Sequence, residues 1–129
     1  MSDKGKIRSF KDLIVWQKAD KLFYDLIEDI KSFPRTRVAY VIINQMLNSV
    51  SSISSNIAEA TGCRSAKDFE HFLVISRRST VESENWYIKI NNLDYISEDR
   101  FNFRYKQCEE KRVMLNALIG SSRRKRKLE

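Results

Sequence analysis

The chain has 129 residues, of which 42% are hydrophobic and 32% charged; this is the size and composition of one folded domain and excludes a disordered chain. Only three Gly and one Pro are present, so the chain must consist of long elements joined by few connections, which favours helices over all-β folds. It contains no apolar run long enough to span a bilayer and no signal-like start. With two well-separated cysteines, Cys63 and Cys108, we expect reduced thiols in a cytoplasmic protein that does not enter a membrane.

The positive charge is concentrated at the two ends of the chain. Of the formal net charge of +7, residues 123–129 carry +4 and residues 1–8 carry +2, which leaves about +1 for the body. We therefore divide the chain into a basic N-terminal segment (1–8), a helical body (9–121) and a basic C-terminal tail (122–129). Basic ends suit a phosphate contact, although solubilising tails have the same composition.

The first half of the body predicts two helices. The first covers residues 11–32, with Ser9 and Asp12 spaced as a capping box, and ends before Pro34. Its expected core stripe is Leu13, Trp16, Phe23, Ile27 and Ile30. The second covers residues 36–61 and is rich in serine, whose small side chains allow neighbouring helices to approach closely; Gly62 is expected to stop it in a left-handed conformation. Its expected core stripe is Ile42, Met46, Val50, Ile53, Ile57 and Ala60.

The second half predicts two more helices. The third covers residues 66–92 and is capped by Ser65. Its expected stripe is Phe69, Phe72, Leu73, Ser76, Thr80, Ser83, Trp86 and Ile90. The fourth is capped by Ser97 and is expected to end at Gly120, before the basic tail. Its expected inward residues are Phe101, Tyr105, Cys108, Leu115 and Leu118.

Four helices with short connections predict an all-α fold, an antiparallel up-down-up-down four-helix bundle. A set of apolar residues lies off the expected stripes, and four short helices cannot bury two apolar faces each. These residues are Val15, Leu22, Leu26, Val74, Val81 and Ile88. The surplus indicates a second interface and therefore a homo-oligomer.

The residues available for catalysis argue against an enzyme. Asp68 and His71 have the spacing of one half of a di-iron site, but His71 is the only histidine, so no second half can form. Glu82 and Glu84 are two residues apart and diverge around a helix. Phosphate-binding loops, dinucleotide fingerprints and zinc-type clusters do not occur. We expect no catalytic activity, no cofactor and no metal.

Two groups of basic residues are candidates for nucleic-acid binding. One is the tail, with Arg123, Arg124, Lys125, Arg126 and Lys127. The other is the pair Arg77 and Arg78, which interrupts the small-residue centre of the third helix; one is expected to pair with a carboxylate such as Glu59 and the other to face outward. The remaining basic residues are mixed with acids and read as solvated faces.

Short motifs are spread over residues 9–119. In chain order they comprise Ser9, Phe10, Lys11, Asp12, Leu13, Val15, Trp16, Gln17, Ala19, Phe33, Pro34, Tyr40, Gln45, Asn56, Ile57, Ala58, Glu59, Lys67, Asp68, Phe69, Phe72, Leu73, Ile75, Ser79 and Glu82. In these residues the chain resembles the bacterial four-helix bundle proteins, also called ribosomal RNA intervening-sequence proteins. It departs from their pattern at Ala60, where they have Gly, and at Arg77 and Arg78, where they favour a small residue and Gly.

The resemblance implies a homopentameric barrel without catalytic activity. A related branch, the accessory variability determinant proteins of diversity-generating retroelements, binds nucleic acid and a reverse transcriptase. The leading hypothesis is therefore an oligomeric accessory protein that binds nucleic acid, RNA favoured, with a reverse transcriptase as a candidate partner. The alternative is a protein-interaction scaffold with no nucleic-acid role. For five motif residues we expect structural roles: Asn56 would join helices and Glu59 would pair with an arginine, and the others are Trp16, Gln45 and Glu82.

Overall fold

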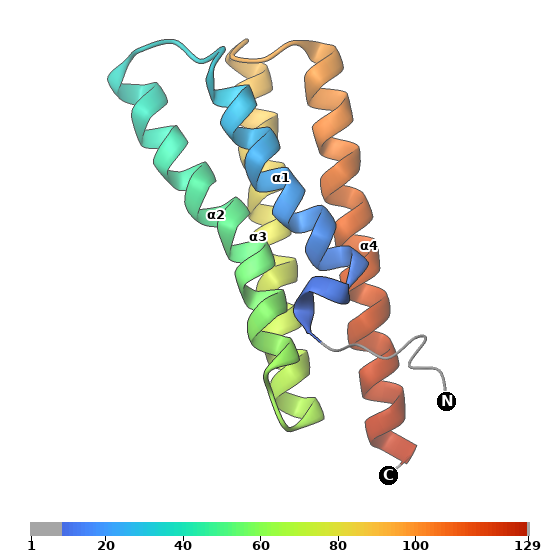
Figure 1. Cartoon of the computed structure of the whole chain (residues 1–129). Coiled ribbons are helices and arrows are strands. Elements are labelled where there is room, and N and C mark those ends of the chain that lie inside the picture. The colour runs from blue at the N-terminus through green and yellow to red at the C-terminus, as the bar shows by residue number, and fades with distance from the viewer. Residues whose placement is uncertain (1–8, 129) are drawn as a thin grey trace.

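The computed structural model describes residues 9–128, and within them the chain is entirely helical. A short 3₁₀ helix, η1 (Phe10–Asp12), precedes α1 (Ile14–Ile30), α2 (Arg37–Thr61), α3 (Ala66–Asn92) and α4 (Glu98–Leu128). Figure 1 shows consecutive helices running in opposite directions, so the expected all-α, up-down-up-down bundle is confirmed. The basic N-terminal segment expected at residues 1–8 lies outside the described residues.

The start of the first helix differs from the prediction. Ser9 and Asp12 do form a capping box, but it closes the 3₁₀ turn η1, and Leu13 is extended before α1 begins at Ile14. The expected core stripe of this helix is only partly right. Its residues Leu13, Trp16, Phe23 and Ile30 are partly buried against the core, but Ile27 is 39% exposed and the residues expected to be surplus are fully buried. The buried residues of α1 are Val15, Ala19, Leu22, Leu26 and Asp29. Both faces of this helix are apolar, so periodicity alone did not identify the inner one.

The prediction for α2 is confirmed, since all six residues of its expected stripe are buried. Its serines lie against those of α3: Ser83 donates to Ser49 at 3.1 Å, Ser79 donates to Ser52 at 2.9 Å, and Ser76 donates to the carbonyl oxygen of Ile53 at 2.8 Å. Hydroxyls paired in this way allow two helices to approach closely without an unsatisfied polar group.

Two helix ends also correct the prediction. Gly62 follows α2 with φ of −85°, so the backbone there is right-handed and does not require glycine. Helix α4 passes through Gly120 without a break and continues to Leu128, which makes the expected tail helical. On α3, Leu73, Tyr87 and Ile90 are buried, whereas Trp86 is only half-buried.

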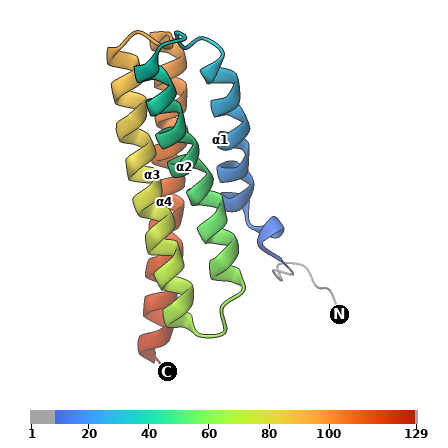
Figure 2. The same ribbon diagram turned by 90° about the vertical axis from the view of Figure 1, so that its left-hand side faces the viewer.

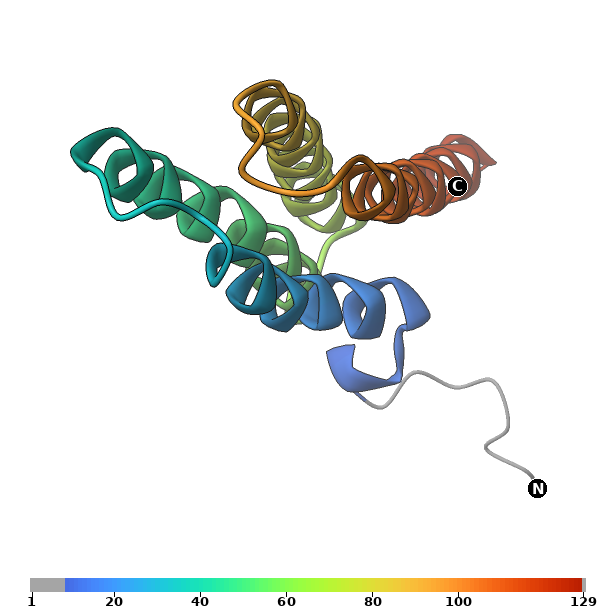
Figure 3. The same ribbon diagram turned by 90° about the horizontal axis from the view of Figure 1, so that it is seen from above.

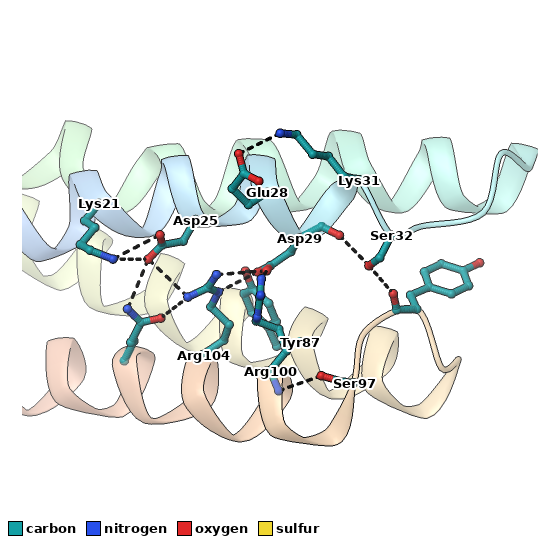
Figure 4. Close-up of polar contacts among 12 residues, drawn as sticks. Lys21, Asp25, Glu28, Asp29, Lys31, Ser32, Tyr87, Ser97, Arg100 and Arg104 are labelled. Atoms are coloured by element: carbon teal, nitrogen blue, oxygen red, sulfur yellow. Dashed lines mark hydrogen bonds and ion pairs between the residues drawn. The ribbon is translucent and has the colours of Figure 1, made fainter.

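A buried carboxylate on α1 joins three helices. The side chain of Asp29 is fully buried and accepts hydrogen bonds from Tyr87 Oη at 2.8 Å and Arg100 Nη1 at 2.6 Å. Arg104 contributes two more, from Nε at 2.8 Å and Nη2 at 3.1 Å. Figure 4 shows these donors converging from α3 and α4 on the end of α1. A buried charge of this kind is stable only when it is paired and hydrogen-bonded, as here.

The network also fixes the ionisation of its members. Burial of the phenol, together with the neighbouring charge of Asp29, raises the pKa of Tyr87 well above its ordinary value. For Arg104, burial works against the charged guanidinium, but the hydrogen bonds and charge of Asp29 outweigh it and raise the pKa. Tyr87 is therefore held as a neutral donor and Arg104 as a charged one.

The helices are not evenly packed. Helix α2 packs mainly on α3 and α3 on α4, whereas the contact between α1 and α4 is the sparsest between long helices. The view from above in Figure 3 and the side view in Figure 2 show α1 lying along α2, toward one side of the α3–α4 pair. The seam between α1 and α4 therefore contains pockets of about 380 and 390 Å³.

Candidate nucleic-acid interface

Basic side chains gather at the end of the bundle where α4 terminates. We call this the basic end and define it by Arg64, Lys67, Arg123, Arg124, Lys125, Arg126 and Lys127. Figure 1 shows the C-terminal end of α4 at the same end of the molecule as the α2–α3 connection, which carries Arg64. Arg64 and Lys67 had been interpreted as part of a solvated face, and the structure adds them to the candidate site.

The basic end is ordered by one acid on α3. Glu70 accepts hydrogen bonds from Arg126 Nη2 at 2.8 Å, Arg126 Nε at 3.1 Å and Ser122 Oγ at 2.7 Å. Arg123 Nε lies 3.9 Å from the same carboxylate. The hydrogen bonds from Arg126, and then from Ser122, lower the pKa of Glu70 to about 2. Glu70 is 4% exposed although it is charged, which is explained by this set of donors.

This contact explains why α4 does not end at Gly120. Ser122 and Arg126 are four residues apart, so both lie on the face of α4 that meets Glu70. Lysine and arginine are good helix formers, and cations are favourable near a helix C-terminus. The tendency of glycine to end a helix is therefore outweighed by the contact of Arg126 with Glu70, which lies 56 residues earlier in the sequence.

Among residues 9–128, five of the seven cations of the basic end form no ion pair, and three of these five lie on α4. Arg124, Lys125 and Lys127 are exposed and, among residues 9–128, form no ion pair. Two neighbouring pockets of about 330 and 360 Å³ share the walls Ala66, Phe69 and Leu118; one reaches Lys125 and the other Arg64. The unpaired cations therefore flank a shallow, partly apolar surface, and phosphates are the natural ligands for such a surface.

Arg77 and Arg78 differ from each other. Arg77 is half-buried, and its Nη1 donates to Asn116 Oδ1 on α4 at 2.9 Å. The predicted pairing of an arginine with Glu59 is wrong, because the Glu59 side chain is exposed and forms no ion pair within the described residues. Arg78 is exposed and points outward, as expected. Arg77 therefore belongs to the α3–α4 seam, about two turns from Glu70, and only Arg78 is available to a ligand.

The other motif residues are scattered. Asn56 Nδ2 donates to the carbonyl oxygen of Ser52 at 2.8 Å and to its Oγ at 2.9 Å, and the same Oγ accepts from Ser79 on α3. Asn56 thus supports the serine contact between α2 and α3 from within α2 and does not itself hydrogen-bond to α3. Trp16 packs against Phe10, with ring centroids 4.9 Å apart. Gln45 and Glu82 are exposed and form no side-chain hydrogen bond within the described part of the chain.

Sequence reasoning missed several buried charged residues: Asp29, Glu70, Glu84, Arg104 and Lys111. Each lies on a helix face that also carries apolar residues. A charged residue at a core-facing position of the apolar repeat was therefore the signal from which its burial could have been predicted. Arg112 Nε pairs with Glu84 at 2.9 Å. With Glu70–Arg126 and Arg77–Asn116, this pair forms a ladder of polar contacts along α3 and α4.

The described residues contain neither a candidate metal-binding cluster nor a membrane-spanning helix. Residues 9–128 contain no group of three His, Cys, Asp or Glu side chains placed to hold a metal ion. No helix in that range has the length and apolar character needed to cross a bilayer. His71 is exposed, and its ring lies 5.3 Å from that of Phe72, between centroids.

The fold defines a small antiparallel four-helix bundle whose distinguishing feature is a basic end. A family model for the 23S rRNA-intervening sequence protein matches residues 11–117, and the chain belongs to that family. The fold is also similar to that of a crystal structure of a protein of unknown function from the S23 ribosomal protein family of Bacteroides thetaiotaomicron. That likeness has a TM-score of 0.76 at 24% sequence identity and covers 82% of this chain and 98% of the other. Among curated proteins, none matches this chain.

Proposed function

We propose that the protein is a non-enzymatic accessory protein that binds nucleic acid, RNA in preference, through its basic end. The observation that carries this proposal is the set of exposed, unpaired cations on the last turns of α4, held in a fixed position by Glu70. Arg78 is exposed on α3 and adds a further phosphate contact, whereas Arg77 is held by Asn116. The family description, which refers to ribosomal RNA, is consistent with an RNA ligand.

A salt titration with matched charge variants tests the proposal. The test variant replaces Arg124, Lys125 and Lys127 with Gln and leaves the Glu70 contact intact. The control replaces Arg35, Arg37 and Lys89, which are exposed, unpaired among the described residues and placed at the opposite end. For single-stranded RNA, loss of three phosphate contacts reduces the slope of log K against log salt by about 2. Equal slopes for the two variants would contradict the proposal.

We further propose that the functional form is a homo-oligomer. A pentamer is in line with the resemblance to the four-helix bundle family, and it would place five basic ends around one ring. Support comes from large apolar side chains left exposed on the single chain. They include Tyr24 on α1, Val38, Tyr40 and Val41 on α2, and Val81 and Ile88 on α3. Exposed apolar side chains that gather on a protein surface mark interaction sites. Sedimentation equilibrium gives the mass directly, and a monomer at micromolar concentration would refute this part.

A reverse transcriptase of a diversity-generating retroelement is the protein partner that we propose for this oligomer, in keeping with the related branch. Co-purification of the tagged protein with such an enzyme, before and after nuclease treatment, tests it. A complex that survives nuclease, combined with an absence of salt-dependent RNA binding, would favour the scaffold alternative, which the same exposed apolar side chains support.

A further inference from the structure

A second cluster of basic residues lies far from the basic end, in the seam between α1 and α4. A pocket of about 390 Å³ there is lined by Lys18 and Lys21 of α1 and by Phe103, Lys106 and Lys111 of α4. Four lysines converge on it from two helices, and Glu110 is the single acid in its lining. We call it the lysine pocket.

The floor of the lysine pocket is a buried cation. Lys111 is 1% exposed, and its Nζ donates one hydrogen bond, to the carbonyl oxygen of Gln107 at 2.9 Å. Within residues 9–128 it forms no ion pair, although the charges of Glu110 and Asp25 lie near enough to favour its ammonium form. Burial disfavours the ammonium form and lowers the pKa of Lys111. Fully buried lysines are almost always paired, and an ammonium group has three donors, so this side chain retains unused capacity for an anion.

The rim of the pocket is only partly neutralised. Lys18 Nζ lies 2.8 Å from Glu110 Oε1, and Lys21 Nζ lies 3.0 Å from Asp25 Oδ2. Lys106 is exposed and, like Lys111, has no ion pair among the described residues. Two lysines of the pocket therefore form no ion pair among the described residues, Lys106 on the rim and Lys111 on the floor.

An aromatic ring completes the site. Phe103 is 58% exposed and precedes Lys106 by three residues, which places both on one face of α4. A large exposed phenyl ring beside unpaired lysines is the combination with which single-stranded nucleic acids are bound, since bases stack on the ring and phosphates contact the cations. Bases in a duplex are already stacked and cannot use the ring in this way.

We propose that the lysine pocket binds a single-stranded nucleic-acid segment, with a backbone phosphate on Lys106 and Lys111 and a base stacked on Phe103. This inference rests on the proposed function and adds a contact that the basic end does not supply. Lys106 and Arg124 are 18 residues apart on one helix, so the two sites are about 27 Å apart along its axis. A strand that reaches both gains affinity from the linkage, whereas a dinucleotide occupies only one.

The test is a nuclear magnetic resonance titration of the full chain with a 5′-phosphorylated uridine dinucleotide. We expect shifts of the Phe103 ring and the Lys106 side chain, and binding weakened about tenfold by either Phe103→Ala or Lys106→Ala. Both residues are exposed, so these variants should fold; Lys111→Met, which keeps the length of the stem, should weaken binding as well. Lys89→Ala removes a comparable exposed charge elsewhere and should leave the titration unchanged.

The outcomes separate this inference from the proposed function. If RNA binding depends on the basic end but neither pocket variant alters dinucleotide binding, the lysine pocket is not a nucleic-acid site and the proposed function stands. If the wild-type chain binds neither the dinucleotide nor longer RNA, both are wrong. Inorganic phosphate or polyglutamate binding as tightly as the dinucleotide, with no effect of Phe103→Ala, would also overturn the inference, because it would identify a general anion site.

Discussion

Replacing Asp29 with Asn should destabilise the bundle strongly, although it changes one oxygen to an NH₂ group. The carboxylate accepts four hydrogen bonds, two of them from Arg104. An amide keeps one acceptor and directs its own hydrogens at donors. The guanidinium of Arg104 is 6% exposed and would retain the carboxylate of Asp25, at 3.4 Å, and the side-chain oxygen of Gln107, at 3.1 Å.

Breaking a buried ion pair by removing one partner costs about 3–5 kcal/mol. We expect about 3 kcal/mol for Asp29→Asn, at the low end of that range, because Asp25 remains and because Arg100 can turn to solvent. Urea denaturation at pH 7, followed by circular dichroism, measures this loss as a lower midpoint with an unchanged slope.

Asp20→Asn is the matched control, since Asp20 lies on the same helix and has no ion-pair partner in the described residues. It should change the free energy of unfolding by less than about 0.5 kcal/mol. Adding Arg104→Met to Asp29→Asn should recover part of the loss, because it removes the buried charge left unpaired. A loss below about 1 kcal/mol for Asp29→Asn would refute the reasoning.

Three further predictions concern α4 and the cysteines. The pKa of Glu70 is lowered from 4.5 to about 2, so its ion pair stabilises the fold above pH 4.5 and this stabilisation is lost as the pH falls toward 2. The difference in Tm between wild type and Glu70→Gln, measured at low salt, should therefore shrink to zero over that interval. A difference that stays constant with pH would contradict this. Gly120→Ala should raise the free energy of unfolding in urea by about 0.5–1 kcal/mol, because the added methyl group meets only the flexible end of Arg124 at 3.3 Å; a loss of stability would show that the close approach matters. Burial raises the pKa of Cys108 to about 12, so at pH 8 a thiol reagent should modify the half-buried Cys63 first and reach Cys108 only in urea; equal rates in the native protein would exclude this packing.

Much of the fold was predictable because its signals are local. Pro34, the caps Ser65 and Ser97, and the stripe on α2 act within a few residues of themselves, and the structure agrees with all of them. The centre of the buried face of α1 was misplaced, because an apolar repeat shows that a face is buried but not which surface it packs against. Which of two apolar faces turns inward depends on α2, whose partner surface is distant in sequence.

The candidate site was predictable only in part. The unpaired cations of the basic end are evident from composition, but the addition of Arg64 and the separation of Arg77 from Arg78 depend on how α3 meets α4. The lysine pocket was not visible at all, because Lys18 and Lys111 read as ordinary solvated charges until two helices are placed side by side.

The sequence by itself therefore determined the helices, their caps, their antiparallel order and the location of the charge at the chain end, since propensity, capping and periodicity are local properties. The tertiary structure alone decided which charges are buried and what they meet. Asp29 pairs with Arg104, 75 residues away in the sequence, and Glu70 pairs with Arg126, 56 residues away. The second pair holds the last turns of α4 in place as a helical surface, because the carboxylate of Glu70 on α3 supplies a contact that the local sequence does not.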